Sequence, residues 1–521
     1  MSEIFKEAYN FHQRGLLEEA KEKYLELIKL DNNNFEAHNL LGALYLQKKD
    51  FNNALLLISR AVAINTSSYS CYNNLGTTYK EINDYSNSLI SYDKAIQLKF
   101  DYAEAYNNKA AVLTIINNFE AALENYNQAI KIKPDYAEAY NNRGILFIKI
   151  QKYEFAMEDF LKAVSLKKDY YETYANLGMT NHTMGFYKEA LKYFDISINL
   201  NKDFYLAHWN KSHTELITGN FDSGWKNYDY RWKKRDVPSP RYSLVEKYWK
   251  GSYLDGTLLI WGEQGIGDNI YFSSLLPEAS KLAKKIILEV DQRILKLVKR
   301  YLEKINIKNF EFRSIHGKIS DHYDKHIPIG SLGNFVKKNN FNSTNNKHYL
   351  LADQNVENKI KKFLLEKDLK NIGISWRTLN ADEGFRNIDL DQLLPILNFS
   401  NCRFFNLQFG SFDQELLQFN TKNNIKIHSV DNIDNFEDLE SLACVINSMD
   451  FVITIQNTIA HLAGALGKKT FLILAKNHRW QWGLKDTVSW YPNIKIYRQK
   501  YFHDWSDPIK RIFNDIKNDL I

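Results

Sequence analysis

Apolar positions in the first half of the chain recur every 34 residues. The clearest mark is a small residue followed four positions later by an aromatic or aliphatic one, a spacing that puts both on one face of a helix. The series comprises Ala20 and Tyr24, Ala54 and Ile58, Ser88 and Tyr92, Ala122 and Tyr126, Ala156 and Phe160, Ala190 and Phe194, and Gly224 and Tyr228. A second recurring set, at Leu41-Gly42, Leu75-Gly76 and Leu177-Gly178, predicts another helix in each unit. Helix pairs of this kind bury their apolar faces only by stacking.

This repeat resembles the tetratricopeptide repeat (TPR) family, whose unit is a helix–turn–helix of 34 residues. About six units are clear, and a seventh from about residue 205 is degenerate. The resemblance implies an all-α TPR superhelix over residues 1–232, which would recruit a peptide or protein. The aromatic segment that ends it, around Trp225 and Trp232, is expected to cap the repeats at the next domain.

One polar position also repeats at this spacing. It holds Asn74, Asn108, Asn142, Asn176 and Asn210. Amide side chains on the concave face of the repeats would bind an extended peptide backbone without reading its sequence. In O-GlcNAc transferase, which the architecture resembles, such asparagines bind the acceptor protein. The alternative is that they serve helix packing.

The pattern changes type after residue 232. Residues 233–256 form a charged linker with prolines, and short apolar runs then alternate with helical stretches. The predicted strands are residues 257–261, 286–290, 372–376, 404–407, 425–427, 451–455 and 470–474. Such alternation predicts parallel α/β sheets. We expect two Rossmann-like lobes, residues 257–365 and residues 366–521, the second ending in a helix.

Two glycine-bearing turns each follow a predicted strand and open a helix. The first runs from Trp261 to Asp268, and Gly265 and Gly267 would let a ligand approach the backbone. The second is at residues 456–467, where the amides of Asn457, Thr458, Ile459 and Ala460 are expected to be free to hold a diphosphate. Neither turn matches the dinucleotide fingerprint with three glycines.

Together these turns resemble bacterial TPR-containing glycosyltransferases related to the ADP-heptose:lipopolysaccharide heptosyltransferases. The resemblance covers roughly residues 240–500. It also rests on residues 372–376, 406–408, 490–492 and 498–499. It implies a GT-B fold, transfer of a sugar from a nucleotide sugar to an acceptor hydroxyl, and no metal or other cofactor. Residues 257–365 would be the acceptor side and residues 366–521 the nucleotide-sugar side. The acceptor would be a protein, a glycan or a lipid-linked group.

The resemblance also implies roles for single residues. Asp268 would be the general base, with helix capping as its alternative. Arg377 and Arg386 would face the donor phosphates, or else be solvated surface arginines. Gln408 would contact the nucleotide or cap its strand. His461, one turn into the second helix, is the other catalytic candidate, with a core histidine as its alternative.

Gln456 departs from the family pattern, in which an aspartate is common. A glutamine cannot take the charged role of that residue. This substitution supports a competing interpretation, in which the chain is a non-catalytic TPR adaptor with a nucleotide-sugar-binding or degenerate α/β domain. A scaffold without any ligand is the third alternative.

Composition narrows the class of protein. The formal net charge is +6 over 521 residues, with no long basic run, which argues against a nucleic-acid partner. The three cysteines are far apart and fit no metal spacing. No apolar run has the length of a signal peptide core or a membrane span, so we expect a cytoplasmic protein.

Overall fold

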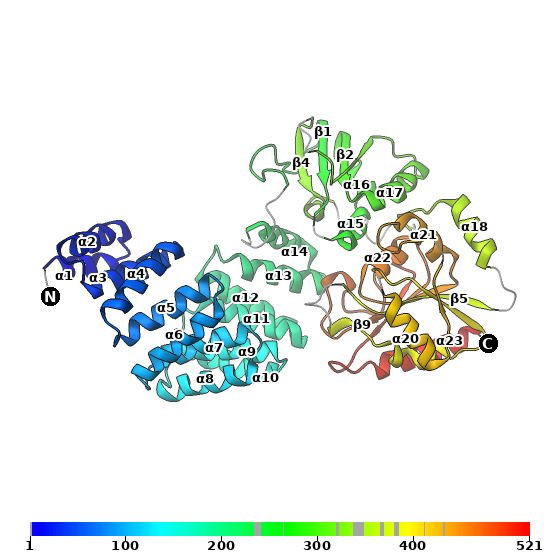
Figure 1. Ribbon diagram of the computed structural model, residues 1–521. Helices are drawn as coiled ribbons and strands as arrows, with labels where there is room; N and C mark the ends of the chain where they lie inside the picture. The colour runs from blue at the N-terminus through cyan, green and yellow to red at the C-terminus, as the bar shows by residue number, and fades with distance from the viewer. Residues whose placement is uncertain are drawn as a thin grey trace. The chain divides into compact units, whose positions relative to one another are not determined.

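The computed structural model describes residues 3–233, 241–263, 265–318, 322–336, 348–364, 369–379, 385–410, 412–430 and 433–520. They belong to two compact units, residues 1–207 and residues 208–521. Below, these are the repeat unit and the α/β unit. Figure 1 colours the repeat unit from blue to cyan and the two sheets of the α/β unit from green to red.

The repeat unit is built from antiparallel helix pairs. They are α1 (Glu3–Gln13) with α2 (Leu17–Leu30), α3 (Phe35–Gln47) with α4 (Phe51–Ile64), α5 (Tyr69–Glu81) with α6 (Tyr85–Leu98), α7 (Ala103–Ile115) with α8 (Phe119–Ile132), α9 (Ala137–Lys149) with α10 (Tyr153–Leu166), and α11 (Tyr171–Met184) with α12 (Tyr187–Leu200). The turn inside each pair needs one residue with positive φ. Asn83 and Asn117 supply it at 62°, and Gly185 at 90°. Glycine and asparagine adopt this conformation most readily.

Glycine on the first helix of a pair lets the second helix approach. A Cβ on Gly144 would lie 2.5 Å from the Phe160 ring, and one on Gly178 would lie 2.6 Å from the Phe194 ring. Both aromatic rings are fully buried. The predicted helix pairs are therefore confirmed.

The α/β unit begins inside a helix. Helix α13 (Tyr205–Ile217) spans the boundary at residue 207, and α14 (Phe221–Tyr228) and the 3-10 helix η1 (Asp229–Lys233) follow it. A Cβ on Gly333 would lie 2.3 Å from the indole of Trp225, so α14 packs closely against the segment around Gly333. The sequence had assigned residues 208–232 to the repeats, whereas their packing belongs to the α/β unit.

The first sheet is parallel, with strand order β3-β2-β1-β4. Its strands are β1 (Leu254–Trp261), β2 (Ala283–Val290), β3 (Phe310–Ser314) and β4 (Lys325–Pro328). The helices between and after them are α15 (Ile266–Ser273), α16 (Leu276–Ala279), α17 (Gln292–Lys304) and the 3-10 helix η2 (Ile329–Asn334).

The second sheet is also parallel, with order β10-β9-β8-β5-β6-β7. Its strands are β5 (Lys370–Ser375), β6 (Cys402–Asn406), β7 (Ile427–His428), β8 (Phe451–Ile455), β9 (Thr470–Leu474) and β10 (Ile494–Arg498). Its helices are α18 (Gln354–Leu364), η5 (Leu390–Leu393), α19 (Leu394–Leu397), α20 (Asp413–Asn423), α21 (Leu439–Ser448), α22 (Thr458–Ala465), η6 (Trp480–Trp482) and α23 (Ser506–Leu520). Counted from β5, this is the 3-2-1-4-5-6 order of doubly wound sheets.

Each predicted strand overlaps an observed one, so the prediction of parallel α/β sheets is confirmed. Strands β3, β4 and β10 were not predicted. In β3 the burial is intermediate throughout and charged residues alternate with phenylalanines, which weakens the apolar signal. Strand β4 is only four residues long and begins with a lysine.

Candidate active site

The strand order of each sheet reverses at one point, and ligands of doubly wound proteins bind beside that point, at the carboxyl ends of the strands. In the second sheet it lies between β5 and β8. Asn457, just after β8, bridges it because its Nδ2 donates to Ser375 Oγ at 2.6 Å and to the Arg377 carbonyl at 3.1 Å. The predicted turn at residues 456–467 therefore stands where a ligand is expected.

Asn457 also caps helix α22. Its Oδ1 accepts from the Ile459 amide at 3.0 Å and from the Ala460 amide at 3.3 Å. The sequence predicted that the amides of Ile459 and Ala460 are free. Both are hydrogen-bonded to the side chain of Asn457, which is the N-cap residue of this helix. A diphosphate at Thr458 would have to compete with this side chain for them.

The first sheet has the same arrangement between β1 and β4. Glu263, which follows β1, accepts from the Gly330 amide after β4 at 2.9 Å. Its carboxylate is held from the other side by Arg231 of η1, with Nε and Nη2 at 2.7 and 2.6 Å. Both side chains are almost fully buried. A buried ion pair therefore anchors the turn that leads to Asp268.

Asp268 lies in the first turn of α15 and is buried. Gly265 occupies the N-cap position, so the alternative role of Asp268 as an N-cap is not observed. Its carboxylate contacts the segment after β9: Gln481 Nε2 is 3.3 Å from Oδ1, and Arg479 Nη1 is 3.6 Å from Oδ2. The carboxylate thus reaches from the helix of the first sheet to a loop of the second.

Helices α15 and α22 meet at a glycine. A Cβ on Gly267 would lie 3.3 Å from His461 Cδ2 and 3.9 Å from Thr458 Oγ1, whereas one on Gly265 would meet no atom of the described residues within 4 Å. Gly267 therefore serves the approach of the two helices, and Gly265 leaves open space. The two predicted turns, which are far apart in sequence, lie together.

His461 is enclosed by aromatic rings. The Trp482 ring centre lies 4.9 Å away, and the Tyr491 hydroxyl lies 2.9 Å from His461 Nδ1. Tyr349 donates to that hydroxyl at 3.1 Å. Burial, and then the charge of Arg479, lower the pKa of His461 to about 3. With so low a pKa the imidazole stays neutral at physiological pH and is a weak base, and its catalytic role stays a prediction.

The other predicted site residues hold the loop after β5. Gln408 Oε1 accepts from Ser375 Oγ and from the amides of Trp376 and Arg377 at 2.9–3.1 Å, and its Nε2 donates to the Arg377 and Phe409 carbonyls. This places Gln408 as a clamp on the loop. Its contact with a nucleotide stays a prediction.

The two predicted phosphate-binding arginines differ in setting. Arg377 pairs with Glu415 at 2.9 Å and with Asp389 at 3.4 Å. Arg386 is buried, with its guanidinium carbon 5.2 Å from the centre of the Phe385 ring.

Arg479 and Gln481 were missed as site residues. They follow β9, and the carboxyl end of a parallel strand was the available signal, because the strand itself had been predicted. Gln456, after β8, accepts from the Arg479 amide at 3.3 Å through Oε1 and is 4% exposed. The position that departs from the family pattern thus touches the segment that contacts Asp268.

Four of the repeated asparagines are hydrogen-bonded to other asparagines in the preceding repeat. Each donates Nδ2 to an asparagine Oδ1 of the preceding repeat: Asn74 to Asn39 at 2.9 Å, and Asn108 to Asn73, Asn142 to Asn107 and Asn176 to Asn141 at 3.0 Å. For Asn210 the corresponding residue is Ala175, which has no acceptor side chain. The amides therefore link neighbouring repeats, and their binding of a peptide stays a prediction.

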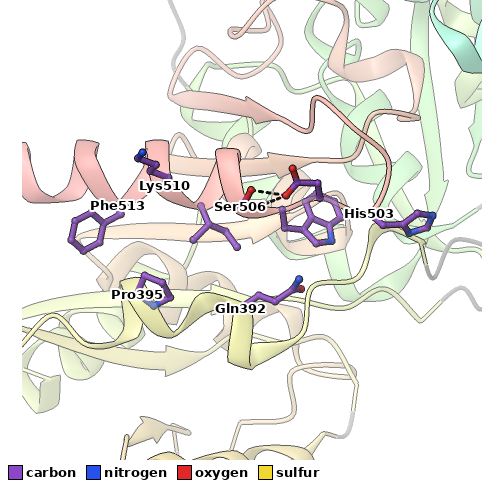
Figure 2. Close-up of a pocket in the computed structure, with 9 residues that line it drawn as sticks. Gln392, Pro395, His503, Ser506, Lys510 and Phe513 are labelled. Carbon is purple, nitrogen blue, oxygen red and sulfur yellow. Dashed lines mark hydrogen bonds between the residues drawn. The ribbon is translucent and has the colours of Figure 1, made fainter.

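A cavity of about 480 Å³ lies beside α23 (Figure 2). Its lining includes Gln392, Pro395, His503, Ser506, Lys510 and Phe513. None of the predicted site residues lines it.

In the described part of the chain, no three His, Cys, Asp or Glu side chains are grouped as a metal site would need. No described helix has the length and apolar character required to cross a membrane.

Comparison with known proteins identifies the repeats. Models described as TPR repeat and tetratricopeptide repeat match residues 8–49, 112–151, 69–102 and 137–170. Protein FlbA of Caulobacter vibrioides is 23% identical over 319 residues, which cover 58% of this chain and 53% of that protein. The chain thus spans about half the length of this relative.

Solved structures similar to this chain include MamA, which is 26% identical. The match covers 31% of this chain and 94% of the MamA chain, with a TM-score of 0.28. A tetratricopeptide repeat protein from Parabacteroides merdae ATCC 43184 has 15% identity, 44% and 90% coverage and a TM-score of 0.37. YrrB, described as a TPR protein with an unusual peptide-binding site, has 17% identity, 35% and 95% coverage and a TM-score of 0.28. The matched residues of the chain are TPR repeats.

Proposed function

We propose that the α/β unit is a glycosyltransferase of GT-B type, which moves a sugar from a nucleotide sugar to an acceptor hydroxyl. The observation that carries this proposal is the meeting of the two turns. Gly267, on helix α15 of the first sheet, approaches His461, on helix α22 of the second sheet. The Asp268 carboxylate contacts Arg479 and Gln481. A transferase that joins two substrates needs groups from both sides at one place.

The reaction assigns one task to each group. The acceptor oxygen forms a bond to the anomeric carbon as Asp268 removes its proton. The bond from that carbon to the diphosphate oxygen breaks, and the nucleotide diphosphate leaves with the electron pair. Arg479, whose side chain is 40% exposed, stabilises the leaving charge together with the start of α22. Arg377 and Arg386 are the further candidates for this role.

The donor would also prepare the base. Without a ligand, Arg479 pairs with the Asp268 carboxylate. A diphosphate that binds Arg479 competes with this ion pair, so Asp268 becomes available to the acceptor hydroxyl only once the donor is present. The neutral His461 then acts as a hydrogen-bonding group in the site.

The repeat unit would deliver the acceptor. TPR repeats bind peptides and proteins, and here they are covalently joined to the α/β unit. A tethered recruiting surface raises the effective concentration of its partner. We infer a protein acceptor, with a glycan or a lipid-linked group as the alternatives.

The test is transfer or hydrolysis of UDP-, GDP-, ADP- and CMP-linked sugars by the full chain, followed by Asp268→Asn. The variant should lower turnover by about 10²–10⁴-fold and keep donor binding. Asp413→Asn is the matched control, because Asp413 is also in the first turn of a helix but is exposed. Unchanged turnover in Asp268→Asn would show that the base is another group.

One observation favours a second function, a TPR adaptor whose α/β unit binds a nucleotide sugar without turnover. The amides of Ile459 and Ala460 are occupied by Asn457, and the family's aspartate is replaced by Gln456. This adaptor would bind a nucleotide sugar and raise the melting temperature, yet release no free nucleotide.

A further inference from the structure

Two glutamine side chains near Asp268 have their orientation set by a fixed partner. Gln456 Oε1 accepts from the Arg479 amide at 3.3 Å. Gln481 Nε2 donates to Asp268 Oδ1 at 3.3 Å. Turning either amide over would place two donors or two acceptors against each other. Gln456 therefore presents its NH₂ group, and Gln481 presents its carbonyl oxygen.

These two presented atoms are buried without a partner. Gln456 is 4% exposed and Gln481 is 3% exposed. Within the described residues, neither Gln456 Nε2 nor Gln481 Oε1 has a hydrogen-bond partner. Buried polar groups are almost always paired, and an unpaired one is costly. A complementary pair of such atoms, one donor and one acceptor, therefore points to a missing group.

The two side chains belong to one neighbourhood, as the contacts of their other polar atoms show. Gln456 contacts Arg479, which is two residues before Gln481, and both Arg479 and Gln481 contact Asp268. Gln456 also stands immediately after β8, at the point where the strand order of the second sheet reverses. The missing group thus lies beside the carboxylate that the proposed function assigns to catalysis.

We propose that Gln456 and Gln481 read a hydroxyl of the transferred sugar, and that this sugar is uncharged. The inference rests on the proposed function and narrows its substrate class. A hydroxyl accepts from Gln456 Nε2 and donates to Gln481 Oε1 through a single oxygen. A carboxylate only accepts, so it would leave Gln481 unpaired and bring a second negative charge towards Asp268.

This role explains why glutamine could replace the aspartate that is common at position 456 in the family pattern. An aspartate there would present acceptors only, and would accept a hydrogen bond from the hydroxyl. Gln456 instead presents a donor, and the acceptor comes from Gln481. The substitution therefore changes how the sugar is recognised and leaves the backbone around α22 as it is.

The test compares affinities by calorimetry on the full chain, for UDP-glucose, UDP-glucuronate, GDP-mannose and ADP-glucose and for the matching free diphosphates. We expect Gln456→Met, which keeps the length of the side chain, to weaken the preferred neutral nucleotide sugar about five- to tenfold. Its affinity for the free diphosphate should stay within about twofold. Gln414→Met, on the exposed face of α20, is the control and should change neither affinity.

The outcomes separate the two proposals. If no nucleotide or nucleotide sugar binds the native chain, the proposed function fails and this inference fails with it. If nucleotides bind, three results overturn the inference alone: no sugar improves on its diphosphate, UDP-glucuronate binds more tightly than UDP-glucose, or Gln456→Met leaves the sugar's contribution intact. The last result would mean that the buried amides hold water and not substrate.

Discussion

Removing the buried guanidinium of Arg231, which pairs with Glu263 beside the first sheet, should make the α/β unit unfold at a much lower urea concentration. Arg231 donates to Glu263 through two nitrogens, to Ser331 Oγ at 3.0 Å and to Asp229 Oδ1 at 2.8 Å. Burial alone would lower the pKa of Arg231, but Glu263 and Asp229 raise it above its ordinary value. In Arg231→Met these partners lose their cation. Among the described residues, the Glu263 carboxylate then keeps the Gly330 amide as its one hydrogen-bond donor.

The size of the loss follows from burial. The side chains of Arg231 and Glu263 are 3% and 2% exposed, so water cannot replace the lost partner. Breaking such a pair from one side costs about 3–5 kcal/mol, because a charge is left buried and uncompensated. Replacing both members is much cheaper, so Arg231→Met combined with Glu263→Gln should recover a large part of the loss.

Urea unfolding followed by tryptophan fluorescence measures this directly. All ten tryptophans lie at residue 209 or later, so the signal reports on the α/β unit alone. Arg143→Met is the matched control, because Arg143 pairs with Asp159 in the repeat unit at 2.6 Å. It should shift the helical signal of circular dichroism and leave the tryptophan transition in place.

A loss below about 1 kcal/mol in Arg231→Met would refute the reasoning, since that is the value of a solvated surface pair. A double variant that is as unstable as the sum of the two single ones would also refute it, because the two residues would then not be coupled.

Three further outcomes are expected. Asn141→Ala should lower the stability of the repeat unit by about 1–2 kcal/mol, measured by circular dichroism, because Asn176 loses its acceptor. Gly144→Ala should cost about 1–3 kcal/mol through its collision with Phe160, and Phe160→Leu in the same chain should reduce that cost. The free energy of unfolding of the α/β unit should fall as the pH drops below 6.5. In the unfolded chain His461 takes up a proton there, whereas in the folded protein it stays neutral until the pH reaches its lowered pKa of about 3. That contribution is about 1.4 kcal/mol per pH unit, and His461→Asn should remove it from the urea midpoints measured at pH 7, 6 and 5.

The positions that the sequence predicted best are those decided by local periodicity. Ala122 and Tyr126 lie on one helical face wherever the helix is placed, and Phe451 to Ile455 read as a buried strand from their apolar run alone. Site residues were harder to predict for two reasons. Arg479 matters because a loop after β9 returns to Asp268, which is 211 positions earlier in the chain. The amides at α22 were expected to be free, and only their geometry reveals that Asn457 binds them.

By itself the sequence determined the helical repeats, the change to parallel α/β sheets and the positions of the two glycine-bearing turns, because spacings of four residues and short apolar runs act within a single element. Only the tertiary structure decided which partners those elements meet. It grouped the contacts of residues 208–233 with the α/β unit, paired the repeated asparagines with other asparagines of the preceding repeat, and buried His461 among aromatic rings. Those outcomes depend on contacts between elements that are distant in sequence, and burial then sets which charges and hydrogen bonds survive.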